Sequence, residues 1–150
     1  ETPPGITGQA IRSGLFDAQA ALLAGDAAQA AQGIADAQAA ADRLLPLFAA
    51  EPGVASAVEA GLATAGVAVE ANDAEGLAIA SGQIWATLMR GAYAETLASV
   101  EAGDAKAAAS WLLLRDFRFA SLATVLTELG LLTRSQTADE DLDLAAACPA

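Results

Sequence analysis

Three charged residues that could do binding chemistry, Arg115, Asp116 and Arg118, stand together late in the chain. On a helix, Arg115 and Arg118 are three residues apart and share a face, whereas Asp116 does not face Arg115. We therefore expect Asp116 to reach an arginine on a neighbouring helix, and Arg12 and Arg90 are the candidates. Such a network either fixes the register of packed helices through partly buried ion pairs, or grips an anion or carboxylate with the planar guanidinium.

Aromatic side chains accompany these charges. The stretch from Ile84 to Phe119 holds both tryptophans and the single tyrosine of a chain that is otherwise rich in alanine. We expect an aromatic cluster to accompany the charged network, with the aromatic side chains as part of the core where the network fixes helix register. Its members would be Trp85, Tyr93, Trp111 and Phe117.

Most catalytic chemistry is excluded by residue type. The chain has no histidine, which removes Ser-His-Asp and Cys-His catalysis, Glu-x-x-His di-iron sites and almost all zinc and copper sites. It also lacks a glycine-rich phosphate loop and a nucleophile elbow. Isolated acids are spread along the chain without a spacing that singles out a catalytic pair: Glu59, Glu70, Glu75 and Glu95. We expect no enzymatic activity.

An acidic segment, residues 133–150, follows the last predicted helix and ends near the lone Cys148. It contains Asp139, Glu140, Asp141 and Asp143. A run of like charges is usually a solvated end or linker. The alternative is a weak site for a hard cation such as iron or calcium, because carboxylate oxygens are the ligands that such ions prefer.

Net charge restricts the partners. A formal charge of −12 over 150 residues leaves no basic face for nucleic acid or for anionic membranes. No uncharged apolar run reaches the ~18 residues that a membrane span needs. The chain opens with Glu1-Thr2-Pro3-Pro4-Gly5, which resembles the end left by removal of a signal peptide. We therefore expect a mature domain in the periplasm or cell envelope, with a protein partner there.

The elements that must position these residues are helices, because alanine is the best helix former and β-branched and aromatic residues are sparse. Apolar spacing predicts helices over 6–24, 27–50, 54–71, 74–102 and 105–129. Gly25-Asp26 and Gly103-Asp104 supply a left-handed stop followed by an N-cap, and Pro46 should kink the second helix near its end. The prediction is an all-α antiparallel bundle of four to five helices over residues 1–132.

Helical spacing also predicts which side chains are buried. In the first helix the apolar stripe is Ile11, Leu15, Ala18 and Leu22, widened by Phe16, Ala20 and Leu23. In the fourth helix it is Leu77, Ile84, Leu88, Tyr93, Leu97 and Val100, with Trp85 and Met89 beside it.

An internal repeat appears when the chain is shifted by 78 residues onto itself. Arg12 then matches Arg90, and Ala24–Ala27 matches Ala102–Ala105. This suggests two related helical hairpins, the first with the second helix and the fourth with the fifth, joined by the third. Chance similarity between alanine-rich segments is the alternative.

The runs IWATLMRGAY (84–93), AGD (102–104) and WLLLRDFR (111–118) resemble the N-terminal extracytoplasmic helical region of bacterial members of the high-affinity iron permease family. LFDAQAALLAGD (15–26) is similar to the first hairpin of that region, so the likeness covers about residues 10–120. The Arg-Glu-x-x-Glu signature and the membrane helices of the permeases are absent from this chain. The resemblance therefore implies association with iron uptake, not permease activity.

Three functions remain open at this point. The first is a non-catalytic binding or assembly module outside the cytoplasmic membrane, associated with iron uptake or an envelope complex. The second is a purely structural envelope subunit. The third is a weak carboxylate-based binder of iron or calcium.

Overall fold

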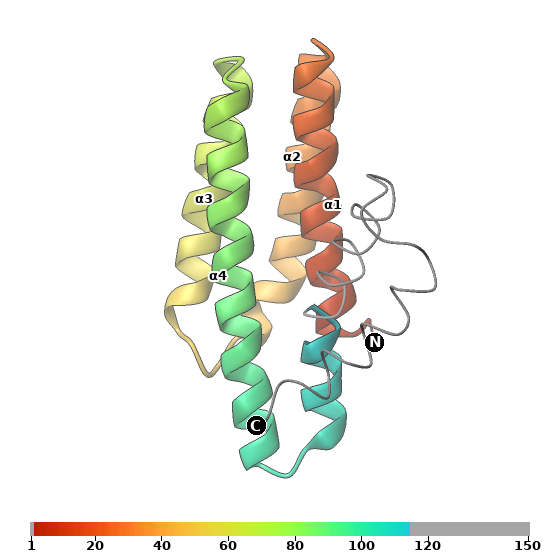
Figure 1. The fold of residues 1–150 in the computed structure, drawn as a ribbon, viewed down its shortest axis with the longest axis vertical. Helices are drawn as coiled ribbons and strands as arrows, with labels where there is room; N and C mark the ends of the chain where they lie inside the picture. Colours follow the sequence, from red (N-terminus) through yellow and green to blue (C-terminus); the bar gives the residue numbers. More distant parts are fainter. Residues whose placement is uncertain (1, 115–150) are drawn as a thin grey trace, which may run out of the picture. The chain divides into compact units, whose positions relative to one another are not determined.

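The computed structural model describes residues 2–114, and this part of the chain is an antiparallel helical bundle (Figure 1). Its elements are α1 (Pro4–Leu23), α2 (Ala27–Leu44), the short 3₁₀ helix η1 (Leu45–Leu47), α3 (Gly53–Glu70), α4 (Ala74–Glu101) and a fifth helix described over Ala105–Leu114. The all-α prediction is confirmed. The continuation of the fifth helix and the acidic segment lie outside the described residues.

The α1–α2 and α4–fifth-helix corners have the predicted stop-and-cap geometry. Gly25 and Gly103 adopt φ values of 79° and 75°, a left-handed conformation that glycine reaches without a steric cost. The carboxylates of Asp26 and Asp104 each accept a hydrogen bond, 2.9 Å long, from the backbone N–H three residues later. The capped donors begin the next helix, so each corner turns the chain back within the three residues that separate the helices.

The corner between α3 and α4 repeats this geometry with a different first residue. Asn72 has φ 55°, and the Asp73 carboxylate accepts from the N–H of Gly76 at 2.8 Å. Three corners therefore share one geometry, so the match between Gly25 and Gly103 does not separate duplication from chance similarity. The tight corner also makes α3 the antiparallel hairpin partner of α4. We had expected the third helix only to join the two hairpins.

Pro46 ends the second helix earlier than predicted. The α-helix stops at Leu44, and Pro46 lies in η1 instead of kinking a helix that continues to residue 50. Proline lacks the N–H that an α-helix needs and clashes one turn back, which accounts for the switch. The extended backbone at Phe48 then starts the connection to α3.

The core is made mostly of alanine and branched aliphatic side chains on the predicted stripes. Ile11, Leu15, Ala18 and Leu22 of α1 are buried, and so are Leu77, Ile84 and Leu88 of α4. Six other predictions were wrong, because the side chains are exposed: Phe16, Ala20, Leu23, Tyr93, Leu97 and Val100. At ~100° per residue, Tyr93 lies about 140° around α4 from Leu88 and Leu97 about 180°, so both leave the buried face.

Among the described residues, one helix, α3, is long and apolar enough to cross a membrane by length and composition. It also carries Glu59 and Glu70, and it packs Val58, Leu62 and Ala65 into the bundle. This pattern is what a core helix of a bundle requires, since one face must be apolar along its whole length.

Candidate functional site

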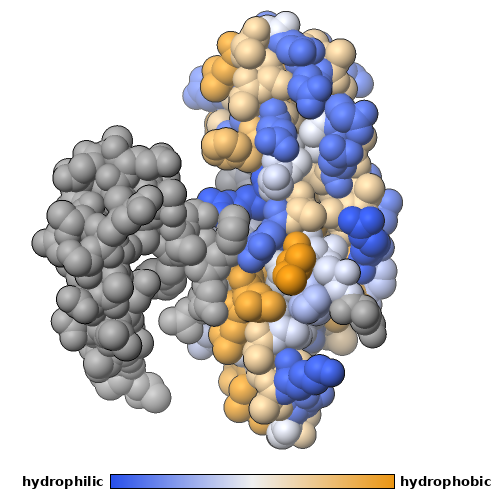
Figure 2. Space-filling view, turned by 90° about the vertical axis from the view of Figure 1, so that its right-hand side faces the viewer, coloured by the Kyte–Doolittle hydropathy of each residue, from blue (hydrophilic) through white to orange (hydrophobic). Residues whose placement is uncertain are grey.

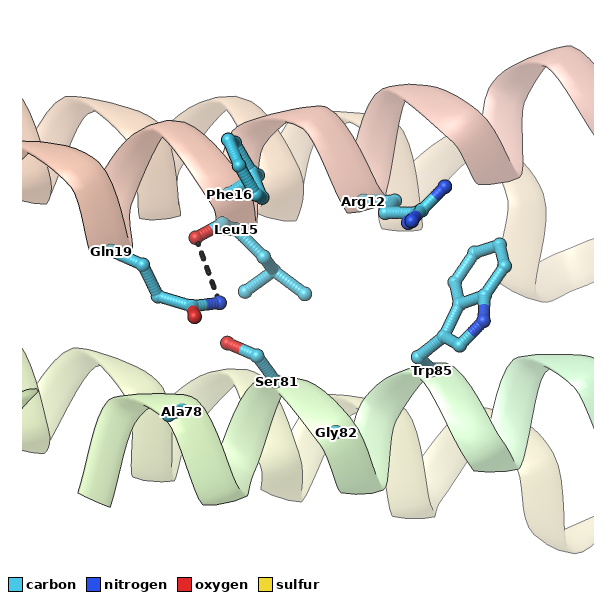
Figure 3. A pocket seen from close by; sticks show the side chains of 8 residues that line it. All are labelled: Arg12, Leu15, Phe16, Gln19, Ala78, Ser81, Gly82 and Trp85. Atoms are coloured by element: carbon cyan, nitrogen blue, oxygen red, sulfur yellow. Dashed lines mark hydrogen bonds between the residues drawn. The ribbon is translucent and has the colours of Figure 1, made fainter. Parts of the chain in front are cut away.

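A groove lies between α1 and α4, where the two hairpins meet (Figure 3). It has a volume of about 260 Å³. Its described lining comes from α1 (Arg12, Leu15, Phe16 and Gln19) and from α4 (Ala78, Ser81, Gly82 and Trp85). Small residues at Ala78 and Gly82 leave the α4 side open, and a Cβ added at Gly82 would meet no atom within 4 Å.

One end of the groove carries Arg12 and Trp85 from the predicted site. The Arg12 guanidinium carbon lies 5.3 Å from the centre of the Trp85 ring, within the range of a cation–π interaction. Both side chains are half-buried. The contact spans α1 and α4, so it fixes a cationic group at the seam between the two hairpins.

The other end of the groove carries an amide and a hydroxyl, from Gln19 and Ser81 (Figure 3). The Gln19 side-chain N–H donates to the carbonyl of Leu15 at 3.4 Å, and the Ser81 hydroxyl donates to the carbonyl of Leu77 at 2.8 Å. Leu15 lies between the two ends and gives the groove an apolar floor. The amide oxygen of Gln19 and the hydroxyl oxygen of Ser81 can still accept hydrogen bonds.

Arg90 has different surroundings from Arg12, although the 78-residue shift matches the two. Its Nε lies 3.8 Å from Oε1 of Glu51, and both side chains are largely exposed. Exposed pairs of this kind contribute little to stability. The remaining members of the predicted network, Arg115, Asp116 and Arg118, lie outside the described residues.

Glu95 of α4 fastens the connection between the hairpins. It is the only charged side chain among residues 2–114 that is buried, with 7% of its surface exposed. One carboxylate oxygen accepts hydrogen bonds from the backbone N–H groups of Ala49 and Ala50, the latter 2.6 Å long. These bonds satisfy donors in a segment that has no regular structure of its own.

Gly91 makes room for the same connection. A Cβ at this position would lie 2.7 Å from the Phe48 ring and 2.7 Å from Val54, too close for a real contact. Phe48 also packs on Trp111, with ring centroids 4.9 Å apart and planes tilted by 39°. We call Arg90, Gly91, Glu95 and Trp111 the connection clamp, since each of them contacts or makes room for residues 48–51.

The four predicted aromatic residues have separate roles. Trp85 stacks with Arg12 in the groove, and Trp111 packs on Phe48 in the connection clamp. Tyr93 is 72% exposed and lines a cavity of about 60 Å³ together with Trp111. Phe117 lies outside the described residues.

No group of three or more potential metal-ligating side chains occurs within residues 2–114. Asp139, Glu140, Asp141 and Asp143, which were the sequence-predicted candidates for a cation site, lie outside the described residues. The isolated acids of the described part serve as helix caps, as solvent-facing groups or, at Glu95, in the connection clamp.

Comparison with protein families settles the resemblance seen in the sequence. The model of the iron permease FTR1 N-terminal domain matches residues 1–150. The chain belongs to this family. No curated protein and no solved structure matches it. Membership associates the chain with iron uptake, and the residues that carried the resemblance have structural positions as far as Leu114.

Sequence reasoning missed two parts of this arrangement. Glu95 looked like one of several scattered acids, and only its position opposite the connection distinguishes it. The groove was missed because Phe16 was assigned to the core and because Gln19, Ser81 and Gly82 are ordinary residues at helix positions. The one available signal was the pairing of rare types: Arg12 is one of seven basic residues, and Trp85 is one of two tryptophans.

Proposed function

We propose that this domain is a non-catalytic assembly module of an iron permease system and acts outside the cytoplasmic membrane through a protein partner. The match to the iron permease N-terminal domain over residues 1–150 is the observation that carries the proposal. The partner would be the membrane part of the permease or a protein bound to it.

The structural positions of residues in the family-like runs support an assembly role. Arg90, Gly91 and Trp111 belong to the family-like runs, and together with Glu95 they contact or make room for the connection instead of gathering around one reactive centre. A domain whose distinctive residues build a rigid scaffold is suited to presenting a surface to a protein partner. The same residues offer no acid–base pair or nucleophile with its base, which catalysis would need.

The exposed apolar side chains of α4 supply a candidate contact surface. Tyr93, Leu97 and Val100 are 72%, 52% and 60% exposed and follow each other at steps of four and three residues, so they form one stripe. We call these three residues the α4 stripe. Figure 2 shows hydrophobic and hydrophilic side chains interspersed on one face, with hydrophobic residues gathered toward its lower end. Apolar side chains ordered along a helix are a common basis of helix-mediated docking.

The test combines co-purification with iron uptake. The domain would be expressed with the permease membrane part, and Leu97→Lys with Val100→Lys would be compared with Ile79→Lys, an equally exposed change in the upper half of α4. We expect the double variant to lose co-purification and to lower uptake of labelled iron, and the control to keep both. Equal behaviour of the two variants would reject the α4 stripe. Unchanged uptake after removal of the whole domain would favour a purely structural envelope subunit.

A further inference from the structure

The α4 stripe lies where α4 projects beyond its partner α3. α4 has 28 residues and α3 has 18, and the two helices share the corner at 71–73, so the C-terminal end of α4 extends past the start of α3 (Figure 1). The fifth helix turns back along this end after Gly103. We call residues 92–112 the tip hairpin.

One side of the tip hairpin is covered and the other is exposed. Glu95 and Trp111 hold the connection on the covered side. At ~100° per residue, Glu95 points about 160° away from Tyr93 and Leu97, so the α4 stripe faces the opposite way. A helical hairpin with an apolar face left over normally buries it against a further element.

We propose that the tip hairpin receives one amphipathic helix from the membrane part of the permease. This helix lies along the α4 stripe and inserts a branched aliphatic side chain beside Tyr93. The inference rests on the proposed assembly role, because it specifies the element of the partner that the α4 stripe contacts.

A second line of apolar residues runs along the fifth helix. Ala105, Ala109 and Leu112 follow each other at steps of four and three residues, so they share one face of that helix. Ala105 and Ala109 are exposed, and Leu112 is half-buried. Leu112 and Tyr93 line the same cavity, so this line meets the α4 stripe there. Small side chains on one line beside bulky ones on the other allow a third helix to approach closely.

The cavity between the two lines fits an aliphatic anchor. It has a volume of about 60 Å³, roughly two water molecules at ~30 Å³ each, which is about the size of an isopropyl group. None of its six described lining side chains is charged: Met89, Ala92, Tyr93, Thr96, Trp111 and Leu112. The hydroxyl of Thr96 donates internally, to the carbonyl of Ala92 at 2.7 Å. Trp111 is 6% exposed and packs on Phe48, so the wall that it forms is firm, as anchor pockets at interfaces require.

Charges beside the α4 stripe select the charge pattern and the direction of the partner helix. Arg90 and Glu101 are both exposed and lie on the same side of α4, ~16 Å apart along the axis at 1.5 Å per residue. The contact between Arg90 and Glu51 is long, 3.8 Å, so the guanidinium keeps donors for a second carboxylate. A partner helix with an acidic residue near Arg90 and a basic residue near Glu101 matches both, whereas the reversed helix places like charges together.

The first test fills the cavity. Binding of the full chain to the purified membrane part is measured for Thr96→Leu and for Thr64→Leu, whose hydroxyl likewise donates to the carbonyl four residues earlier, at 2.9 Å. We expect Thr96→Leu to bind about tenfold more weakly, because leucine occupies the space of the anchor, and Thr64→Leu to stay within about twofold of the parent. Circular dichroism checks that both variants are folded. Equal affinities of the two folded variants would overturn the inference.

The second test reverses one charge. Glu101 and Glu70 are both exposed and are the last residues of α4 and α3, so Glu70→Lys is the matched control for Glu101→Lys. At ~0.15 M salt, where distant charges are screened, we expect Glu101→Lys to weaken binding about threefold or more and the control to leave it unchanged. Equal effects of the two variants would contradict the proposed charge match.

A photo-reactive residue at position 109 identifies the partner element. Cross-links to positions of the membrane part that are spaced three and four residues apart support a helix. Cross-links to adjacent positions, to this chain or to a second copy of it would overturn the inference. If Leu97→Lys with Val100→Lys abolishes binding but Thr96→Leu does not change it, the assembly role stands and the anchor is rejected. No binding by the parent chain would reject both.

Discussion

α1 meets its two neighbours, α2 and α4, in opposite ways. Against α2, Gly14 and Gly33 remove the side chains that would hold the helices apart, so backbone touches backbone. Against α4, Arg12 and Trp85 separate the helices and leave the groove beside Gly82. Residue size at the crossing point therefore decides whether an interface between alanine-rich helices is closed or open.

The difference locates the chemistry of the domain. A closed crossing uses its polar backbone groups internally and offers nothing to a ligand. The open seam leaves a groove between the two hairpins, and the described lining includes an amide and a hydroxyl, from Gln19 and Ser81. Sites between packed elements are common for this reason: the elements supply rigidity, and the imperfect fit between them supplies space.

The largest expected effect breaks the closed interface. Gly33→Ala places a Cβ 2.6 Å from the Gly14 carbonyl oxygen and 2.7 Å from the Ala18 nitrogen, and backbone atoms cannot move aside by changing rotamer. We expect a net loss of about 2–3 kcal/mol in the free energy of unfolding, even after the better helix propensity of alanine is counted. Urea unfolding followed by circular dichroism measures it. A variant as stable as the parent would show that α1 and α2 can separate without cost.

These glycines show what the sequence could and could not predict about the fold. The corners were predicted correctly, because Gly25-Asp26 and Gly103-Asp104 carry local signals for a left-handed stop and a cap. Gly33 carried no such signal, since its purpose depends on Gly14, which is distant in sequence and adjacent in space. Helix existence follows from local propensity, whereas the distance between helices depends on pairs of residues.

The connection clamp is a second closed contact and gives the next effect. Glu95→Ala removes the acceptor of two backbone N–H groups, and we expect a loss of about 2 kcal/mol, because hydrogen bonds to a charged group are strong while the freed N–H groups are partly hydrated. Glu95→Gln is the control: its amide oxygen still accepts, so it should lose less than half as much. An equal loss for the two variants would mean that the charge, and not the acceptor geometry, holds the connection.

The candidate site in the groove was only partly predicted from the sequence. Arg12 and Trp85 were identified because their types are rare in this chain, and the structure brings them together. Their partners Gln19, Ser81 and Gly82 were not, since a groove is a property of how two hairpins fit. Phe16 was assigned to the core because helical spacing marks apolar residues on a stripe and cannot tell where the stripe ends.

The open seam predicts the opposite sign for the same glycine-to-alanine change. Gly82→Ala adds a Cβ that meets no atom within 4 Å, so only the helix propensity changes. We expect stability to rise by up to about 1 kcal/mol. Under the same conditions, Gly33→Ala should lower the free energy of unfolding and Gly82→Ala should raise it. The two interfaces would then differ in the sign of the effect. A destabilised Gly82→Ala would mean that the seam is closed in solution.

The smallest effects compare the two arginines that the 78-residue shift matches. Arg90→Ala removes an exposed pair with Glu51, and we expect a change within about 0.5 kcal/mol in urea unfolding. Arg12→Ala removes the cation over Trp85 and the packing of its half-buried stem, so it should lose about 1 kcal/mol. Equal losses would indicate that the two positions are equivalent, as an intact duplication would have them. A larger loss at Arg12 would show that the seam between the hairpins, and not the repeat, determines what each arginine does.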